Sequence, residues 1–211
     1  QRLKMKKIFS LLLFISLHLF SATLQLAIST NPSRINPILA TGSSSSEIAG
    51  FIFNGLVKYN KDYSKIVGDL ADDFYFKDDK TLIFKLNQHA KWSDGVKFSA
   101  KDVLFTYNTI ISKKIISPYT SDFRFVKSVN IIDDYTLEVK YIKPYFKALE
   151  IWMMGILPEH ILRDEKNLMN SKFNTHPIGT GPYILLKLEH SKNIILEANK
   201  NYFRGKPKIE K

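Results

Sequence analysis

The chain has 211 residues, of which 45% are hydrophobic and 13% aromatic, and it carries a formal charge of +11 at neutral pH. This length and composition exclude a disordered polypeptide and allow one substantial hydrophobic core with part of a second. There is no cysteine, which excludes disulfides, thiolate metal sites, cysteine nucleophiles and a lipid-modified cysteine at a processing site.

The first segment of the chain is basic and then apolar. Four cations among the first seven residues precede the apolar run Ile8–Phe20, and the small residues Ser21 and Ala22 follow. This order is typical of a signal peptide, so residues 1–22 are predicted to be a Sec-type signal peptide with upstream residues, which exports the protein and is cleaved near Ser21 or Ala22. An uncleaved anchor is the alternative, although the run is short for a helix that spans a bilayer.

The next segment predicts a strand, a loop and a helix. Alternating residues predict a strand at Thr23–Ser29, and prolines, a glycine and serines predict a loop at 30–46. Ser44 followed three residues later by Glu47 predicts a capping box that opens the helix.

Three segments have the pattern of a β-hairpin, in which two apolar runs flank a polar turn. They are Leu70–Leu86, Phe125–Tyr141 and Gly181–Asn199. Their turns are predicted at Lys77–Lys80, Asp133–Asp134 and Glu189–Asn193.

Helices are predicted between the hairpins, at about Ala100–Ser112, Tyr145–Met153 and Pro158–Asn167. Strands and helices mix without a strict βαβ rhythm, which predicts an α/β (mixed α+β) fold with several antiparallel hairpins.

The stretch around the first of these helices predicts a turn followed by a capped helix. Trp92 is expected to end a strand, Gly95 to adopt a positive φ in a turn, and Ser99 with Asp102 to cap the helix. Its buried stripe is predicted to be Val103, Leu104, Tyr107 and Ile111.

The sequence contains no recognisable catalytic or cofactor motif. The histidines have no metal-ligand spacing, and Gly179–Gly181 precedes Pro182 instead of a helix, unlike a dinucleotide loop. The paired aspartates fall in or beside turns. We therefore predict no catalytic residue, no metal site and no cofactor. Lysines scattered over turns and strands, behind an export signal, also argue against a nucleic-acid partner.

Three stretches taken together resemble one family. They are Ile35–Asn60, Val67–Asn108 and Pro177–Ile209, which hold a Pro-containing loop and helix, a Leu-Ala hairpin with a Trp-x-Asp-Gly turn, and a Gly-Thr-Gly-Pro-Tyr strand with a Tyr-Phe-x-Gly-x-Pro exit. In this order they resemble the extracytoplasmic solute-binding proteins of peptide ABC transporters, the dipeptide and oligopeptide (family 5) class.

The resemblance implies a periplasmic binding-protein-like clamp of two lobes joined by a hinge. It implies that 23–60 and 168–211 belong to the hinge-bearing lobe, with 61–167 as an inserted smaller α+β domain. Family members are more than twice this long, and their second lobe follows the exit segment. The chain is therefore expected to be an N-terminal fragment in which the second lobe is absent.

Four residues fall where the family lines its cleft. Thr41, Gly42 and Ser43 match the strand that pairs with an extended peptide, and Tyr119 matches a cleft tyrosine. Without the resemblance, 41–43 would be a flexible lead into a helix, and Tyr119 a surface-turn aromatic after Pro118.

The resemblance implies a non-enzymatic, monomeric binding component of an importer. Its partners would be a short peptide ligand and the permease and ATPase subunits of the transporter. A nickel- or metal-chelate-binding member of the family and a non-functional truncated product are alternatives. A secreted hydrolase is less favoured, because no nucleophile constellation is present.

Overall fold

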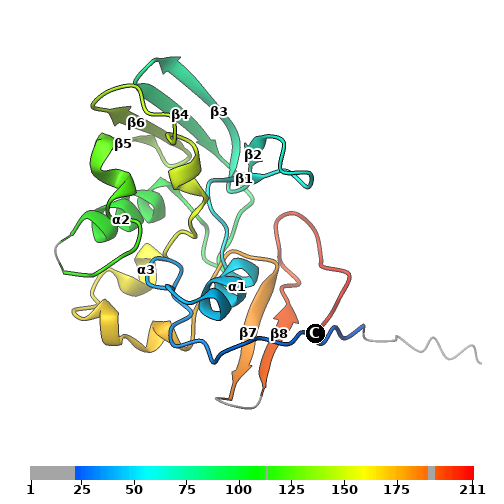
Figure 1. Cartoon of the computed structure of the whole chain (residues 1–211). Coiled ribbons are helices and arrows are strands. Elements are labelled where there is room, and N and C mark those ends of the chain that lie inside the picture. Colours follow the sequence, from blue (N-terminus) through cyan, green and yellow to red (C-terminus); the bar gives the residue numbers. More distant parts are fainter. Residues whose placement is uncertain (1–21, 113, 190–192) are drawn as a thin grey trace, which may run out of the picture.

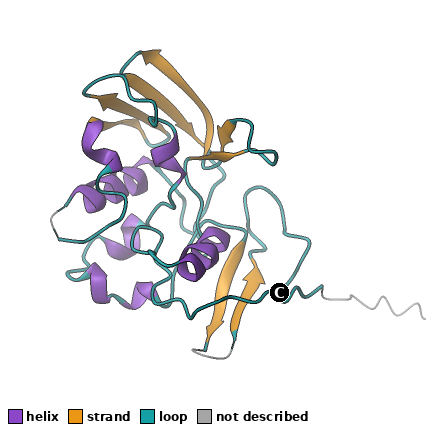
Figure 2. Cartoon of the chain, viewed as in Figure 1, coloured by secondary structure: helices purple, strands orange, loops and turns teal. Residues whose placement is uncertain are grey.

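The structure is a computed structural model that describes residues 22–112, 114–189 and 193–211. The predicted signal peptide lies outside the described residues except for Ala22. The described chain is a mixed α/β fold with several antiparallel sheets, as predicted (Figures 1 and 2).

The described residues form three antiparallel sheets. The largest has the strand order β3-β4-β6-β5 and lies at the top of Figure 1. Its strands are β3 (Ala71–Asp78), β4 (Thr81–Leu86), β6 (Thr136–Tyr141) and β5 (Val126–Asp133). The two smaller sheets are β1 (Val57–Tyr59) with β2 (Ile66–Gly68), and β7 (Tyr183–Leu188) with β8 (Ile194–Ala198).

The helices of the described chain pack against these sheets. The α-helices are α1 (Ser43–Ile52), α2 (Ala100–Ile111) and α3 (Glu159–Leu162). Short 3₁₀ helices occur at Asp122–Phe125, Glu150–Met153, Leu168–Asn170 and Lys172–Asn174. Helix α2 packs against β5, and α1 packs against β7 (Figure 1). No helix within the described ranges has both the length and the apolar character of a bilayer-spanning segment.

The strands of all three predicted hairpins pair, and the first two hairpins share a turn design. The third predicted turn, Glu189–Asn193, lies partly outside the described residues. Asp78 and Asp133 are the last residues of β3 and β5, and each carboxylate accepts the amide two residues ahead, from Lys80 at 2.9 Å and from Tyr135 at 2.8 Å. These hydrogen bonds from backbone amides lower the pKa of both aspartates. The second turn is therefore one residue later than predicted, because Asp133 still belongs to its strand.

Strands β4 and β6 carry the centre of the core. Leu82 lies opposite Val139 and Phe84 opposite Leu137, and all four side chains are fully buried. Alternation with a period of two residues places these side chains on one face of the sheet.

Trp152 packs between the large sheet and the 3₁₀ helix Asp122–Phe125. Its ring meets Phe84 edge-on at 5.8 Å and Phe123 at 5.2 Å between centroids. Its Nε1 donates to the Tyr141 hydroxyl at 3.0 Å, and that hydroxyl donates to the Ala148 carbonyl at 2.6 Å. Burial raises the pKa of Tyr141, so this hydroxyl stays a donor at any physiological pH.

The predicted helix at Tyr145–Met153 is wrong, because a turn and the 3₁₀ helix Glu150–Met153 take its place. In an α-helix the Ala148 carbonyl would accept the Trp152 amide. Here the Ala148 carbonyl accepts from the Tyr141 hydroxyl, and the Trp152 amide donates to the Leu149 carbonyl at 3.0 Å. The predicted helix at Pro158–Asn167 is shortened to α3. The chain turns directly after Leu162, where the Glu165 amide donates to the Leu162 carbonyl.

The strand predicted at Thr23–Ser29 is also wrong. The described chain has no β-strand there, and Leu24 and Leu26 are 54% and 59% exposed. Its start instead meets the end of the described chain, since the Leu24 amide donates to the Lys211 carbonyl and the Glu210 amide to the Ala22 carbonyl. Alternation predicts a strand only where a neighbouring strand supplies a ladder.

The capping box predicted for Ser99 and Asp102 is confirmed. The Ser99 hydroxyl accepts the Lys101 amide, and the Asp102 carboxylate accepts the Ser99 amide at 2.9 Å. Gly95 has the expected positive φ of 94°. The buried stripe of α2 ends on Ile110, which is fully buried, whereas Ile111 is 44% exposed. The predicted stripe was therefore wrong at its last position, because Ile110 turns inward instead of Ile111.

Asp102 gives a test of stability against pH. Burial raises the pKa of its carboxyl, although the amides of Glu159 and Ser99 donate to it. A raised pKa makes the folded state bind the proton more tightly, so the stability this group contributes is complete below the unfolded pKa and is lost as the pH rises through the folded pKa. We expect the free energy of unfolding of the wild type, minus that of Asp102→Asn, to fall as the pH rises from about 4. Denaturant titrations across pH measure this difference, and a rise with pH would contradict it.

Candidate functional site

The segment that holds Thr41, Gly42 and Ser43 lies at the exposed start of α1. A preceding loop fixes it to the core through Ile35, Ile38 and Leu39, all buried. The buried Asn36 closes that loop: its carbonyl accepts the amides of Leu39 and Ala40, and its side chain donates to Asn174 at 3.0 Å. The three predicted residues are themselves exposed.

The capping box predicted at Ser44 and Glu47 is wrong. The N-cap of α1 is Gly42, which has extended backbone and gives no side-chain cap. The Ser44 hydroxyl instead accepts the Thr30 amide at 3.3 Å, and Ser45 accepts the Ser33 amide at 3.2 Å. These two buried serines hold the incoming chain against the helix.

This arrangement leaves the backbone at Gly42 open. No heavy atom lies within 4 Å of the position that a Cβ at Gly42 would occupy. The first amides of an α-helix have no acceptor within the helix, so they point outward as hydrogen-bond donors. Chemically, the segment can offer main-chain groups to another backbone without a side chain in the way.

Tyr119 lies on a loop tied to the same region. The Ser117 hydroxyl donates to the Ile38 carbonyl at 2.7 Å, so this loop and the one that leads to Gly42 are joined directly. The Tyr119 ring is half-buried and packs on the core. Burial, with a smaller effect of Asp122, raises the pKa of its hydroxyl, which therefore stays protonated and able to donate. The ligand contacts of all four residues stay a prediction.

A large hollow among the described residues lies elsewhere. It has a volume of about 1000 Å³ and is lined by 23–31, by Glu47, Ile48 and Phe51 of α1, by the β7–β8 ribbon and by the end of the described chain. None of the four predicted site residues lines it.

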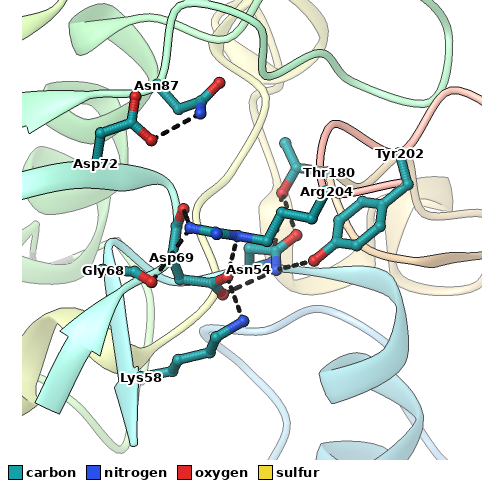
Figure 3. A network of polar contacts seen from close by, with 9 residues as sticks. All are labelled: Asn54, Lys58, Gly68, Asp69, Asp72, Asn87, Thr180, Tyr202 and Arg204. Carbon is teal, nitrogen blue, oxygen red and sulfur yellow. Dashed lines mark hydrogen bonds and ion pairs between the residues drawn. The ribbon is translucent and has the colours of Figure 1, made fainter. Parts of the chain in front are cut away.

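A buried carboxylate, Asp69, organises a polar network that the sequence did not reveal (Figure 3). It lies between β2 and β3 and is 4% exposed. Lys58 Nζ reaches one carboxylate oxygen at 2.8 Å, and Arg204 Nε reaches the same oxygen at 3.3 Å. Arg204 also donates to the main-chain carbonyls of Gly68 at 3.2 Å and Asp69 at 2.5 Å.

Asn54 extends this network towards the β7 strand. Its amide donates to the other Asp69 oxygen at 2.8 Å and to the Tyr202 hydroxyl at 3.3 Å, and its side-chain oxygen accepts from Thr180 at 3.2 Å. Three segments far apart in sequence therefore meet at Asp69 (Figure 3). In the sequence, Asp69 is only a carboxylate next to the apolar Leu70. That pattern does not predict which residues bond to Asp69.

A second polar pair lies near α3. His160 Nε2 and Asp94 Oδ2 are 2.9 Å apart, and the His160 ring lies 6.0 Å from the Trp92 ring. His160 is in the first turn of a helix after Pro158, as the sequence predicted. Within the described ranges, no cluster of three or more histidines and carboxylates could hold a metal ion.

Sequence and structure comparisons give a consistent assignment. A family model for bacterial extracellular solute-binding proteins, family 5, matches residues 65–211. A Brucella ovis protein named as an ABC transporter peptide-binding protein is 34% identical over 83% of this chain. The oligopeptide-binding protein AppA of Bacillus subtilis is 29% identical over 85%. The chain spans 34% of the length of each of these two relatives.

Solved structures agree in fold. NikZ from Campylobacter jejuni, in complex with Ni(L-His), superposes with a TM-score of 0.83 at 32% identity, over 90% of this chain and 38% of that one. AppA from Bacillus subtilis, in complex with a nonapeptide, gives 0.78 at 29% identity, over 84% and 36%. The fold, the family match over most of the chain and these relatives show that the chain belongs to the bacterial extracellular solute-binding proteins of family 5.

Proposed function

We propose that this protein is the periplasmic solute-binding component of an ABC importer, that its ligand is a short peptide, and that it has no enzymatic activity. Family membership and relatives named for peptide binding support this proposal. Its partners would be the permease and ATPase subunits of the importer, and the protein would work as a monomer.

The observation that carries the ligand class is the open backbone at Gly42. A peptide recognised as an added strand needs main-chain groups that its own backbone can approach, and side-chain pockets matter less. The segment 41–43 offers such groups at the uncapped start of α1, and Tyr119 stands on the loop joined to it through Ser117. We propose that these four residues form one wall of the ligand cleft. We also propose that 61–167 form a smaller domain inserted between 23–60 and 168–211.

A nickel chelate is the second candidate. It is favoured by one observation, the similarity to NikZ in complex with Ni(L-His). In that case the wall would contact the organic chelator, since no group of side chains suited to a metal occurs in the described part of the chain.

Isothermal titration calorimetry of the native gene product separates the two candidates. We expect heat of binding with di- to pentapeptides of varied sequence, with little side-chain preference, and none with the nickel–histidine complex. Heat of binding with the nickel complex and none with any peptide would instead support a nickel chelate as the ligand. If neither gave heat of binding, both ligand classes would be refuted.

Substituting Gly42 tests the proposed wall. Gly42→Val places a branched side chain where no atom of the chain lies, so the fold is expected to survive while a ligand backbone can no longer approach. Loss of one main-chain hydrogen bond corresponds to roughly tenfold weaker peptide binding. Gly50→Val is the matched control, because Gly50 is an exposed residue of α1 that is equally open. If the two variants bound peptide with equal affinity, Gly42 would not be part of the proposed wall.

A further inference from the structure

An aromatic–basic surface lies where β5 begins and β6 ends. Its apolar members come from the 3₁₀ helix before β5 and from the chain after β6, and the Ile142 amide joins the two stretches by donating to the Phe125 carbonyl at 2.9 Å. We define the aromatic–basic surface as Arg124, Phe125, Ile142, Lys143, Tyr145, Phe146 and Lys147.

The apolar side chains of this surface are unusually exposed. Phe146 is 88% exposed and Ile142 is 59% exposed. The aromatic rings make tilted and edge-on contacts, with centroids 5.0 Å apart for Phe125 and Tyr145 and 5.7 Å apart for Tyr145 and Phe146. Tyr145 continues to Tyr141 at 6.0 Å, which is part of the core. The exposed ring of Phe146 is therefore connected to the core through Tyr145.

Three cations lie over these rings. Arg124 and Lys143 are each 4.7 Å from the centre of Phe125, and Lys147 is 5.9 Å from the centre of Phe146. Asp122 and Glu150 are the acidic groups whose charges reach Tyr145, and Glu150 already accepts the Tyr59 hydroxyl at 3.1 Å. The surface thus carries an excess of positive charge around a protruding apolar tip.

We propose that the aromatic–basic surface binds the anionic headgroup region of a phospholipid bilayer. Aromatic rings and aliphatic stems prefer the interface between water and hydrocarbon, while Lys and Arg keep their charges among the headgroups. Charge complementarity selects an anionic lipid, because each cation near such a surface adds to binding. The exposed side chains of Phe146 and Ile142 can insert among the lipids, and such a contact would hold the binding protein beside the membrane.

Vesicle sedimentation of the native protein tests this proposal. We expect partition onto vesicles of phosphatidylcholine with one-quarter phosphatidylglycerol, weakened by salt, and much less onto phosphatidylcholine alone. Phe146→Ser is expected to lower the partition coefficient about tenfold. Lys143→Gln and Lys147→Gln are each expected to lower it about fivefold.

Matched controls lie on β3 of the same sheet. Phe76 is 47% exposed and Lys77 is exposed, so Phe76→Ser and Lys77→Gln remove the same chemical groups elsewhere. They are expected to leave partition unchanged, and the N-terminal segment is the same in every variant. Equal binding to both lipid compositions, no binding, or equal losses in the control variants would overturn the proposal. So would variants that keep full vesicle binding but lose capture by the purified permease, since the partner would then be a protein.

Discussion

Replacing Gly179 with alanine is expected to destabilise the protein by about 3 kcal/mol, a large fraction of the stability of a typical domain. A Cβ there would overlap the carbonyl oxygen of Ile52 and approach the Ile52 side chain at 2.7 Å. The backbone cannot move away, because the Gly179 carbonyl accepts the Ser93 amide at 2.8 Å and the Gly181 amide donates to the Ile52 carbonyl at 2.7 Å. Chemical denaturation with circular dichroism measures the loss.

Gly50→Ala is the matched control for this experiment. It introduces the same methyl group on the exposed side of α1, where no atom lies within 4 Å. It should stabilise the helix by about 0.5 to 1 kcal/mol, since alanine is the better helix former. If Gly179→Ala were tolerated as well as Gly50→Ala, the close packing of the 179–181 segment on α1 would be refuted.

Replacing Asp69 with alanine is expected to cost about 2 to 4 kcal/mol. The change leaves the buried Asn54 amide without its carboxylate partner and removes the counter-charge of Lys58 and Arg204. The two cationic side chains are 46% and 36% exposed, so water can take up part of their charge. The loss is therefore smaller than for a fully buried pair.

Asp72→Ala is the control, because Asp72 lies three residues away and its bond to Asn87, at 2.7 Å, is exposed (Figure 3). We expect less than about 1 kcal/mol from it. Thermal unfolding of both variants measures the difference. An Asp69→Ala protein as stable as Asp72→Ala would mean that the network does not hold the three segments together.

Local patterns in the sequence predicted those elements that depend on near neighbours. The hairpins at β3–β4 and β5–β6 follow from alternation and from an Asp that turns the chain, and the cap of α2 follows from Ser99 and Asp102 three residues apart. The failures depend on distant partners. Residues 145–153 are not an α-helix because the Tyr141 hydroxyl bonds to the Ala148 carbonyl and the Trp152 amide bonds to Leu149. Residues 23–29 are not a strand because no ladder forms beside them in the described chain.

The candidate site shows the same division. The resemblance to a family pointed to Gly42 and Tyr119, but only the structure reveals that Ser117 bonds to Ile38 and so joins the two loops. The Asp69 network was invisible for a related reason, since Asn54, Lys58 and Arg204 are ordinary polar residues until folding brings them together. Long-range side-chain pairing leaves no periodic trace in a sequence.

The meeting of Ala22 and Leu24 with Glu210 and Lys211 has a consequence for the order of folding. These backbone hydrogen bonds close nearly the whole described chain into one loop, whereas β3–β4 and β5–β6 each close a turn of two residues. Closing a loop costs more entropy as it lengthens, although each doubling adds only about 0.6 kcal/mol. Contacts of such high sequence separation form late, after local hairpins have shortened the effective distance between them. The start and the end of the described chain should therefore join last on folding.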